Sequence, residues 1–348
     1  MNVDVLVVGG GFAGLKCALQ LSGVVGRDHR IALLTTAEQM TLRPRLRQLA
    51  DGEEALTDIR LERVTESSSL QVLVDAANEI DPEAHLVRTE TGRTIEWKIL
   101  VLAAGVRHRI DTIPGLTEAA WPYWTRQAWI DLPGRLKQLT SHSDRTRRLA
   151  LVLCPGNASP DPFYNAAGTI HRWLRQRALR PRIDLVLATW EPHACALFGT
   201  EDSEEVADYV AWQVDQLWCD FHATAFVDES LVVGKGDLRL EADAIIALPP
   251  QKPALHVPGL PVDDAGFYRI EPDSCRVEGC DDIYAIGDIT AGGPRQAWRA
   301  VLHAERAAAW IVAALTGRPP VLVEFPERRL EPELIRSGGF PNRSHWWN

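Results

Sequence analysis

The chain has 348 residues, of which 46% are hydrophobic and 24% are charged, the composition of a globular protein with room for two domains. Its net charge of -10 argues against nucleic acid as a partner. No run approaches the roughly 18 apolar residues of a membrane span, and we expect no signal peptide, because the apolar N-terminal run ends in glycines. Six scattered cysteines make no disulfide framework and favour a cytoplasmic setting. No metal site is predicted, and the oligomeric state stays open.

The N-terminus predicts a nucleotide-binding turn. Residues 3–8 have the pattern of a buried strand, residues 12–22 that of a helix, and Gly9, Gly11 and Gly14 lie between and within them. In a G-x-G-x-x-G turn the first glycine permits a tight turn, the second lets a pyrophosphate approach the backbone, and the third lets helix and strand pack closely. The N-terminus of the helix then offers free N–H groups to the phosphates. We therefore predict a dinucleotide site here.

The second strand, 31–34, ends where such domains usually carry an acidic ligand for the ribose. Thr35 and Thr36 stand there instead. A threonine hydroxyl accepts a hydrogen bond but is a weaker ribose ligand than a carboxylate, and Glu38 is a possible substitute that comes three residues late.

Residues 42–52 place several basic side chains around one proline. Two interpretations are open for this stretch. It is either the solvated start of a helix, or a segment that holds Arg43 and Pro44 beside a bound cofactor.

Further strands are predicted at 70–75, 85–89 and 99–105, and the last ends in small residues that let the backbone lie against a cofactor. A second βαβ half begins with strand 149–153. Its turn, 154–160, keeps one glycine and contains two prolines, which lack the N–H donors that a phosphate needs. This turn is therefore a poor pyrophosphate cradle. The remaining pattern predicts helices at 163–177, 203–218 and 295–315, and strands at 183–188, 244–248 and 282–288.

Four motifs in this order resemble the flavoproteins of the pyridine nucleotide–disulfide oxidoreductase family: Gly9–Gly14, Leu102–Gly105, the second βαβ half and Tyr284–Asp288. The resemblance implies an α/β fold with two Rossmann-like dinucleotide-binding domains, and FAD as the cofactor. It also implies a discontinuous FAD domain over 1–115 and 241–316, a second NAD(P)-type domain over 116–240, and a C-terminal tail over 317–348 that we expect to be irregular.

Within the family, the stretch from Ile31 to Gly52 is most similar to type II NADH dehydrogenases and sulfide:quinone oxidoreductases. These enzymes often have a basic residue and a proline near the isoalloxazine, which implies that place for Arg43 and Pro44. Asp288 inherits the aspartate that binds the ribityl chain or the pyrophosphate side of FAD. The cofactor-binding residues expected in this way are Gly9, Gly11, Phe12, Ala13, Gly14, Thr35, Arg43, Pro44, Ala76, Ala104, Gly105, Gly287, Asp288 and Ala297.

Departures from the family pattern narrow the chemistry. Without its glycines, the second half is not expected to bind NAD(P)H in the usual way. Ser159 stands where the sulfide branch has a cysteine, which argues against persulfide chemistry, and Cys154 is interpreted as a buried strand-end residue. Cys275 and Cys280 have the spacing of the family's redox disulfide. They lie in the loop before the Gly-Asp strand, however, and we do not expect them to be redox active.

Two residues are candidates for catalysis. Trp298 stands at one of the positions where type II dehydrogenases place glutamines near the quinone, so it either stacks on the flavin edge or an aromatic substrate, or closes the quinone slot. His303 is either a proton donor or a partly exposed helix residue. The tryptophans at 121–129 are candidate walls of a substrate site.

We therefore expect an FAD-dependent oxidoreductase that transfers a hydride or electrons between a small organic substrate, with an aromatic one as an option, and an acceptor. The acceptor is a quinone, oxygen or a redox partner protein. Two alternatives remain: an NAD(P)H:acceptor dehydrogenase of the type II kind, and a non-catalytic flavin-binding partner protein. Trp346 and Trp347 could touch a membrane surface, which leaves peripheral membrane contact as the alternative to a docked tail in a cytoplasmic protein.

Overall fold

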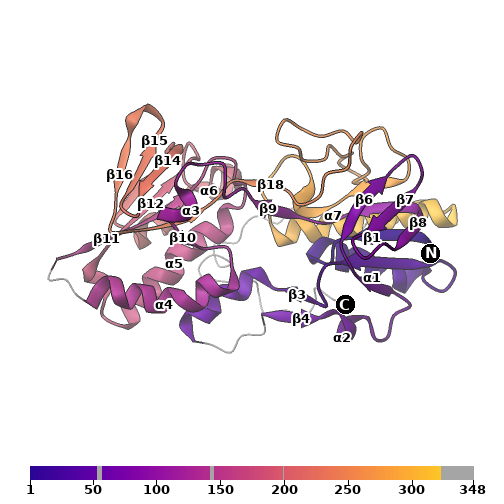
Figure 1. The fold of residues 1–348 in the computed structure, drawn as a ribbon, viewed down its shortest axis with the longest axis horizontal. Coiled ribbons are helices and arrows are strands. Elements are labelled where there is room, and N and C mark those ends of the chain that lie inside the picture. The colour runs from indigo at the N-terminus through magenta and orange to yellow at the C-terminus, as the bar shows by residue number, and fades with distance from the viewer. Residues whose placement is uncertain (53–56, 142–144, 199, 323–348) are drawn as a thin grey trace.

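The computed structural model describes residues 1–52, 57–141, 145–198 and 200–322. Two α/β units lie side by side and are joined by a pair of short strands (Figure 1). Each unit is built on a sheet whose central strands are parallel, so the predicted α/β fold with two Rossmann-like units is confirmed. The predicted contacts of Trp346 and Trp347 lie outside the described residues.

The sheet of the first unit has the strand order β5-β2-β1-β8-β7-β6, and β19 pairs with the C-terminal part of β8. Strands β5, β2, β1, β8 and β19 are parallel, whereas β7 and β6 form an antiparallel hairpin on the N-terminal part of β8. The strands are β1 (Asn2–Val8), β2 (Ile31–Thr35), β5 (Gln71–Val74), β6 (Ala77–Asp81), β7 (Leu86–Thr89), β8 (Thr94–Leu102) and β19 (Ile283–Ala285).

Helices α1 (Phe12–Val25) and α7 (Ala297–Thr316) pack against each other on one face of this sheet. Alanines on α7 let the two helix backbones come close, and the apolar cluster beneath them includes Val5, Val7 and Val101. The opposite face is covered by the loops before β19, whose Tyr268 is buried there. The unit also contains β3 (Gln39–Thr41), η1 (Arg43–Asp51), β4 (Asp58–Arg60), α2 (Leu61–Thr65) and η5 (Gly287–Ile289).

The second unit has a five-stranded parallel sheet in the order β10-β17-β11-β12-β13. One face is covered by helices and the other by the antiparallel sheet β14-β15-β16, so the unit has three layers (Figure 1). Its strands are β10 (Trp121–Pro122), β11 (Arg147–Leu153), β12 (Ile183–Thr189), β13 (Gln216–Trp218), β14 (Ala223–Asp228), β15 (Leu231–Gly234), β16 (Arg239–Glu241) and β17 (Ala244–Leu248). Its helices are α3 (Leu116–Ala119), α4 (Arg126–Ser141), α5 (Pro160–Gln176), η2 (Arg180–Arg182), η3 (Ala196–Phe198), α6 (Thr200–Gln213) and η4 (Lys235–Asp237).

The units contact each other through a pair of strands and through η1. Strands β9 (Val106–His108) and β18 (Gln251–Pro253), which carry the chain out of the first unit and back into it, pair with each other in antiparallel fashion. In addition, η1 leaves the first unit and packs against α4 and α5 of the second. In the stretch 42–52, Arg43 and Arg45 at the start of η1 are exposed, whereas Leu46 and Ala50 are buried in the core of the second unit, so only one side of the segment is solvated.

The structure corrects two predicted boundaries. The helix predicted over 203–218 ends at Gln213, and residues 216–218 form the edge strand β13. Asp215 lies at this change of direction, where its carboxylate accepts hydrogen bonds from the Leu185 N–H and the Arg180 guanidinium at 2.7 and 2.8 Å. Strand β17 pairs with β11 in the second sheet, although the predicted domain limit at residue 241 assigned it to the first domain. We therefore propose that the second unit runs through β17.

Candidate functional site: a nucleotide cradle at the junction of the units

The glycine turn after β1 fits closely against its surroundings. Gly9 has φ = +121°, and a Cβ atom on it would lie 2.3 Å from the carbonyl oxygen of Ala103. A Cβ on Gly14 would lie 1.8 Å from the Gly9 carbonyl oxygen. Any side chain at either position would thus push β8 or α1 away from the turn, as the motif predicts.

Gly11 has the opposite surroundings. A Cβ atom there would meet nothing within 4 Å, and the backbone is extended, with φ = −81° and ψ = −168°. Gly11 is the N-cap of α1, and no side chain caps this end of the helix. The first N–H groups of a helix have no partner inside it. They therefore face the open space beside Gly11, which suits an anionic group.

A second loop, which follows β19, meets the start of α1. The Ile286 N–H donates to the Leu102 carbonyl at 2.9 Å, which continues the pairing of β19 with β8. The chain then turns at Gly287, with φ = +74°, where a Cβ would lie 2.9 Å from the Cβ of Ala13. This contact brings Asp288 beside the N-terminus of α1, as the family motif implies.

His303 on α7 holds this second loop. Its Nδ1 accepts a hydrogen bond of 3.2 Å from the Gly287 N–H, and its ring is only 6% exposed. Burial lowers the pKa of His303 to about 3, assisted by the nearby charges of Arg299 and Arg306. The imidazole is therefore neutral and positions Gly287. The interpretation of His303 as a partly exposed helix residue is wrong, because the side chain is buried, and its use as a proton donor stays a prediction.

Three arginines surround Asp288. Burial raises the pKa of Asp288, while the positive charges of Arg295, Arg43 and Arg299 oppose the shift. The Arg295 guanidinium lies 3.9 Å from the ring centroid of Phe267 and donates to the Asp288 carbonyl at 3.3 Å. One carboxylate among three guanidinium groups leaves local positive charge, which suits the phosphates of a dinucleotide. Arg43 was expected here, whereas Arg295 and Arg299 were not identified from the sequence.

The predicted ribose end of the site lies at the edge formed by β2 and β5. Thr35 is buried, and a Cβ on Gly10 would lie 2.4 Å from its hydroxyl oxygen. The neighbouring Asp75 accepts hydrogen bonds from the Thr91 hydroxyl and the Ala76 N–H, and the pKa of its carboxyl is lowered to about 2, mainly by Thr91. Asp75 is thus the acidic group at this edge. No motif marks it in the sequence, because it simply follows a short strand.

The remaining predicted residues lie around the same turns. Phe12 and Ala13 begin α1, Ala104 and Gly105 follow β8, and Ala297 begins α7. The Trp298 indole N–H donates to the side-chain oxygen of Gln296 at the start of α7. Their contacts with a cofactor stay predictions.

The degraded turn of the second unit docks onto this cradle. The Arg295 N–H donates to the Ala158 carbonyl at 2.8 Å. The turn is held by its own side chains: Asn157 donates to the Pro249 carbonyl at 2.6 Å and accepts from the Ser159 N–H at 2.8 Å. Gln251 donates to the Ser159 hydroxyl at 2.9 Å. These bonds occupy groups that a second pyrophosphate would have to reach.

Glu191 follows strand β12. At the end of this strand a Rossmann unit usually has an acidic residue that binds the ribose hydroxyls. Glu191 is fully buried. One carboxylate oxygen accepts from the hydroxyls of Tyr164 and Thr189, and the other accepts from the Leu197 N–H at 3.0 Å. Because its hydrogen-bonding capacity is used within the protein, Glu191 is not available to a nucleotide.

The tryptophans predicted as substrate walls are divided between two places. Trp121 and Trp129 line a small hollow beside α4 in the second unit. Trp124 lies with its ring centroid 5.3 Å from that of His108 on β9. Burial lowers the pKa of His108 to about 4, and the charge of Arg43 contributes to this shift. Trp124 is therefore the tryptophan of this group that lies toward Arg43, and no sequence pattern pointed to His108.

No disulfide joins the cysteines, and Cys154 and Cys275 are buried within the described ranges. Among the described residues, no group of three or more histidine, cysteine or acidic side chains is placed to hold a metal ion. In the same part of the chain, no helix is long and apolar enough to span a membrane.

Comparison with known proteins agrees with this geometry. Residues 3–139 match the family described as pyridine nucleotide-disulphide oxidoreductase. The predicted resemblance is confirmed. The matched region includes the glycine turn, η1 and β8, and it ends before the second βαβ half begins.

Two curated relatives indicate the branch. The chain is 30% identical over 153 residues to an alternative NAD(P)H-ubiquinone oxidoreductase of Arabidopsis thaliana, covering 39% of this chain and 30% of that protein. It is 26% identical over 195 residues to the sulfide-quinone reductase of Aquifex aeolicus, covering 56% of this chain and 44% of the relative. The chain thus spans less than half of either relative.

Solved structures show that the likeness in fold extends over nearly the whole chain. The sulfide:quinone oxidoreductase of Aquifex aeolicus superposes with a TM-score of 0.77 at 19% identity, covering 90% of this chain and 77% of that one. A ferredoxin reductase from Rhodopseudomonas palustris superposes with a TM-score of 0.68 at 20% identity, covering 92% and 78%.

Proposed function

We propose that the chain is an FAD-dependent oxidoreductase that transfers a hydride or electrons between a small organic substrate and an acceptor. The observation that carries this proposal is the cradle formed by the open, uncapped N-terminus of α1 at Gly11 and the Asp288 loop beside it. A bound isoalloxazine supplies the hydride and electron transfer, while the protein supplies binding, orientation and electrostatics.

The residues of the cradle fit the parts of FAD. The N–H groups at the start of α1 would hold the pyrophosphate, and Gly11 would leave the space for it. Asp288 would accept hydrogen bonds from the ribityl hydroxyls, while Arg43, Arg295 and Arg299 would offset the negative charge. Thr35 would lie toward the ribose of the adenosine, and Asp75 would hold this edge of the site through its hydrogen bonds with Ala76 and Thr91. His303 would keep the Gly287 turn in place through its Nδ1 atom.

Two features of the second unit support this proposal over direct oxidation of NAD(P)H. The 154–160 turn satisfies its own polar groups, and Glu191 is buried with its oxygens occupied. A nicotinamide dinucleotide in the usual position would have to break these bonds, and the buried groups would lose their partners.

The named relatives support a quinone as the acceptor, because two of them are called quinone or ubiquinone reductases. Oxygen and a redox partner protein are the other acceptors that an assay would include. We further propose that the protein works in the cytoplasm, with contact to the membrane surface if the acceptor is a membrane quinone.

Absorbance of the purified protein tests the cofactor first: we expect flavin bands and one FAD per chain. Anaerobic mixing with NADH and then with NADPH tests the electron donor, with flavin bleaching as the readout. We expect slow or no bleaching, while dithionite should bleach the flavin fully. Rapid bleaching by either nucleotide would refute the argument from Glu191, and a colourless protein that cannot be reconstituted with FAD would refute the assignment of the cradle.

A further inference from the structure

The indole of Trp190 crosses the C-terminal edge of the second sheet. Trp190 is the first residue after β12, and its Nε1–H donates to the Asn157 carbonyl at 3.1 Å. Asn157 belongs to the 154–160 turn, which follows β11. Strands β11 and β12 end side by side, with Leu153 opposite Thr189. The side chain therefore reaches from the end of one parallel strand to the turn at the end of its neighbour.

The loop after β13 fixes the indole from another side. The rings of Trp190 and His222 meet edge to face, with 6.4 Å between their centroids and 64° between their planes. The His222 Nε2 atom lies 3.0 Å from a carboxylate oxygen of Asp220. The Asp220 N–H donates to the backbone carbonyl of Glu191 at 2.8 Å. Trp190 is half-buried and packs against the apolar cluster between the sheet and its helices. Its indole is thus held on several sides and has a defined position.

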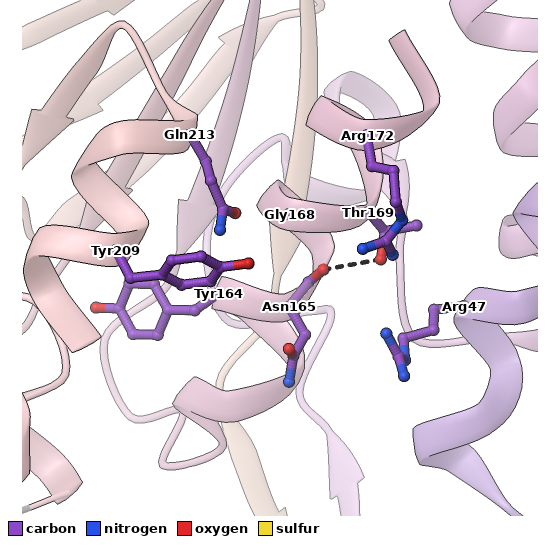
Figure 2. Close-up of a pocket in the computed structure, with 8 residues that line it drawn as sticks. All are labelled: Arg47, Tyr164, Asn165, Gly168, Thr169, Arg172, Tyr209 and Gln213. Carbon is purple, nitrogen blue, oxygen red and sulfur yellow. Dashed lines mark hydrogen bonds between the residues drawn. The ribbon is translucent and has the colours of Figure 1, made fainter. Parts of the chain in front are cut away.

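This position corresponds to a part of the ligand site in a working Rossmann unit. There the pyrophosphate lies at the turn after the first strand, and an acidic residue at the end of the second strand binds the ribose hydroxyls. In the second unit these strands are β11 and β12, so an adenosine would lie between the 154–160 turn and Glu191. The Glu191 carboxylate is held within the protein by Tyr164, which projects from α5 in Figure 2. The neighbouring Trp190 bonds to the turn, and so its ring lies in the remaining space.

We propose that the Trp190 indole occupies the adenosine position of the second unit and thereby excludes NAD(P)H from it. Indole and adenine are both flat, fused five- and six-membered rings, so one position cannot hold both. Trp190 is then a specificity-determining residue, and the electron donor of the flavin is a molecule without an adenylate group. This inference rests on the proposed function, in which the flavin is reduced without a dinucleotide in the second unit.

Isothermal titration of the full chain with adenosine and with indole tests this proposal in Trp190→Ala. Excess FAD is present throughout, so that adenosine does not enter the cradle. We expect adenosine to bind one site per chain in the variant, about 10-fold or more tightly than in the wild-type protein. Indole should bind the variant as well, because an apolar space left by a large side chain takes up a ring of similar size. Binding of indole without adenosine would overturn the proposal, as would an adenosine affinity no higher than that of the wild-type protein.

Trp218→Ala is the matched control. Trp218 is also half-buried, and its indole N–H donates to the Gln216 side chain at 3.2 Å, but its ring packs against Phe221 on the opposite face of the sheet. This variant loses a ring of the same size, yet its affinity for adenosine should stay within about twofold of the wild-type value. Equal binding by Trp218→Ala and Trp190→Ala would show that any lost tryptophan loosens the unit, and would refute the assignment to Trp190.

Two more variants separate the ring from its hydrogen bond and from folding. Trp190→Phe keeps a ring and loses the bond to Asn157, so it should still exclude adenosine. If it binds adenosine as tightly as Trp190→Ala, the lost hydrogen bond opens the unit and the proposal is wrong. Trp190→Val, which keeps more of the core filled, replaces Trp190→Ala if that variant does not fold.

Flavin content, measured in every variant, keeps this test apart from that of the proposed function. The cradle and the adenosine position of the second unit are different sites. A colourless protein that takes up no FAD would refute the proposed function, while the adenosine titration would still decide the role of Trp190. Full flavin content without adenosine binding in Trp190→Ala would refute the role of Trp190 alone.

Discussion

Gly11→Ala separates a role in folding from a role in binding. The new methyl group meets nothing within 4 Å, and the backbone of Gly11 is one that alanine adopts readily. Alanine is a poorer N-cap than glycine, by several tenths of a kcal/mol to about 1 kcal/mol. The smaller entropy of the unfolded chain returns about 0.4–1 kcal/mol. We therefore expect the unfolding free energy of the apoprotein to change by less than about 1 kcal/mol.

The effect on the cofactor should be large, because the methyl group occupies the space proposed for the pyrophosphate. We expect Gly11→Ala to lose its flavin during purification, as measured by the ratio of flavin to protein absorbance. If the affinity falls about 100-fold, the stabilisation by excess FAD falls by about 2.7 kcal/mol, which urea unfolding with and without FAD can measure.

Gly23→Ala is the matched control for this experiment. Gly23 lies in the same helix, is exposed, and also has nothing within 4 Å of its Cβ position. It should stabilise the protein by about 0.5–1 kcal/mol and keep its flavin. Full flavin occupancy in Gly11→Ala would refute the assignment of the α1 N-terminus, and unfolding of the Gly11→Ala apoprotein would show that the glycine is needed for the fold itself.

Two further substitutions test the same site, and a third tests the buried Glu191 of the second unit. Asp288→Ala should abolish flavin retention, and a variant with one FAD per chain would contradict the role given to that carboxylate. The pKa of His303 is lowered from 6.5 to about 3 by burial, so the unfolded state takes up the proton first and stability falls as the pH drops below 6.5. Glutamine in His303→Gln can still accept the Gly287 N–H but does not titrate, so this variant should remove up to about 1.4 kcal/mol per pH unit of that fall in stability. If the unfolding free energy, measured in urea between about pH 7 and about pH 5.5, falls with the same slope in both proteins, the role given to His303 is wrong. Tyr164→Phe removes the hydroxyl that donates to Glu191 and accepts from the Cys195 N–H. It should cost about 1–3 kcal/mol in urea unfolding, and an unchanged midpoint would show that Glu191 finds another partner.

The sequence was most informative where backbone geometry requires a particular residue. The turn at Gly9 and Gly14 was predictable because any side chain there would strike a neighbouring strand or turn. The same holds for Gly287, where the chain has positive φ beside Ala13. Strand and helix patterns around these turns were equally clear, and so the fold of the first unit could be predicted from them.

Contacts between distant segments could not be predicted in this way. Arg295 and Arg299 follow a strand that was identified, but only the packing of α7 brings them to Asp288. The last turn predicted for α6 was wrong because Leu217 continues the apolar spacing of the helix in the sequence, whereas the pairing of residues 216–218 with β12 makes them a strand. No pattern in the sequence marked Glu191 as buried, because its carboxylate is held by Tyr164 from the distant helix α5.

The pairing of β9 with β18 has a mechanical consequence. The chain leaves and re-enters the first unit through two strands that are hydrogen-bonded to each other. We therefore expect this two-stranded connection to resist twisting of one unit against the other more than a single strand would, while it can still bend. A single nick by a protease in either passage would leave the units tied by the other passage and by the pairing itself. The two units are thus expected to behave as one hydrodynamic particle even after such a cut. They should separate only when both passages are cut and the remaining contacts are broken, which include η1 against α4 and α5, Arg126 with Asp58, and the Arg295 N–H with the Ala158 carbonyl.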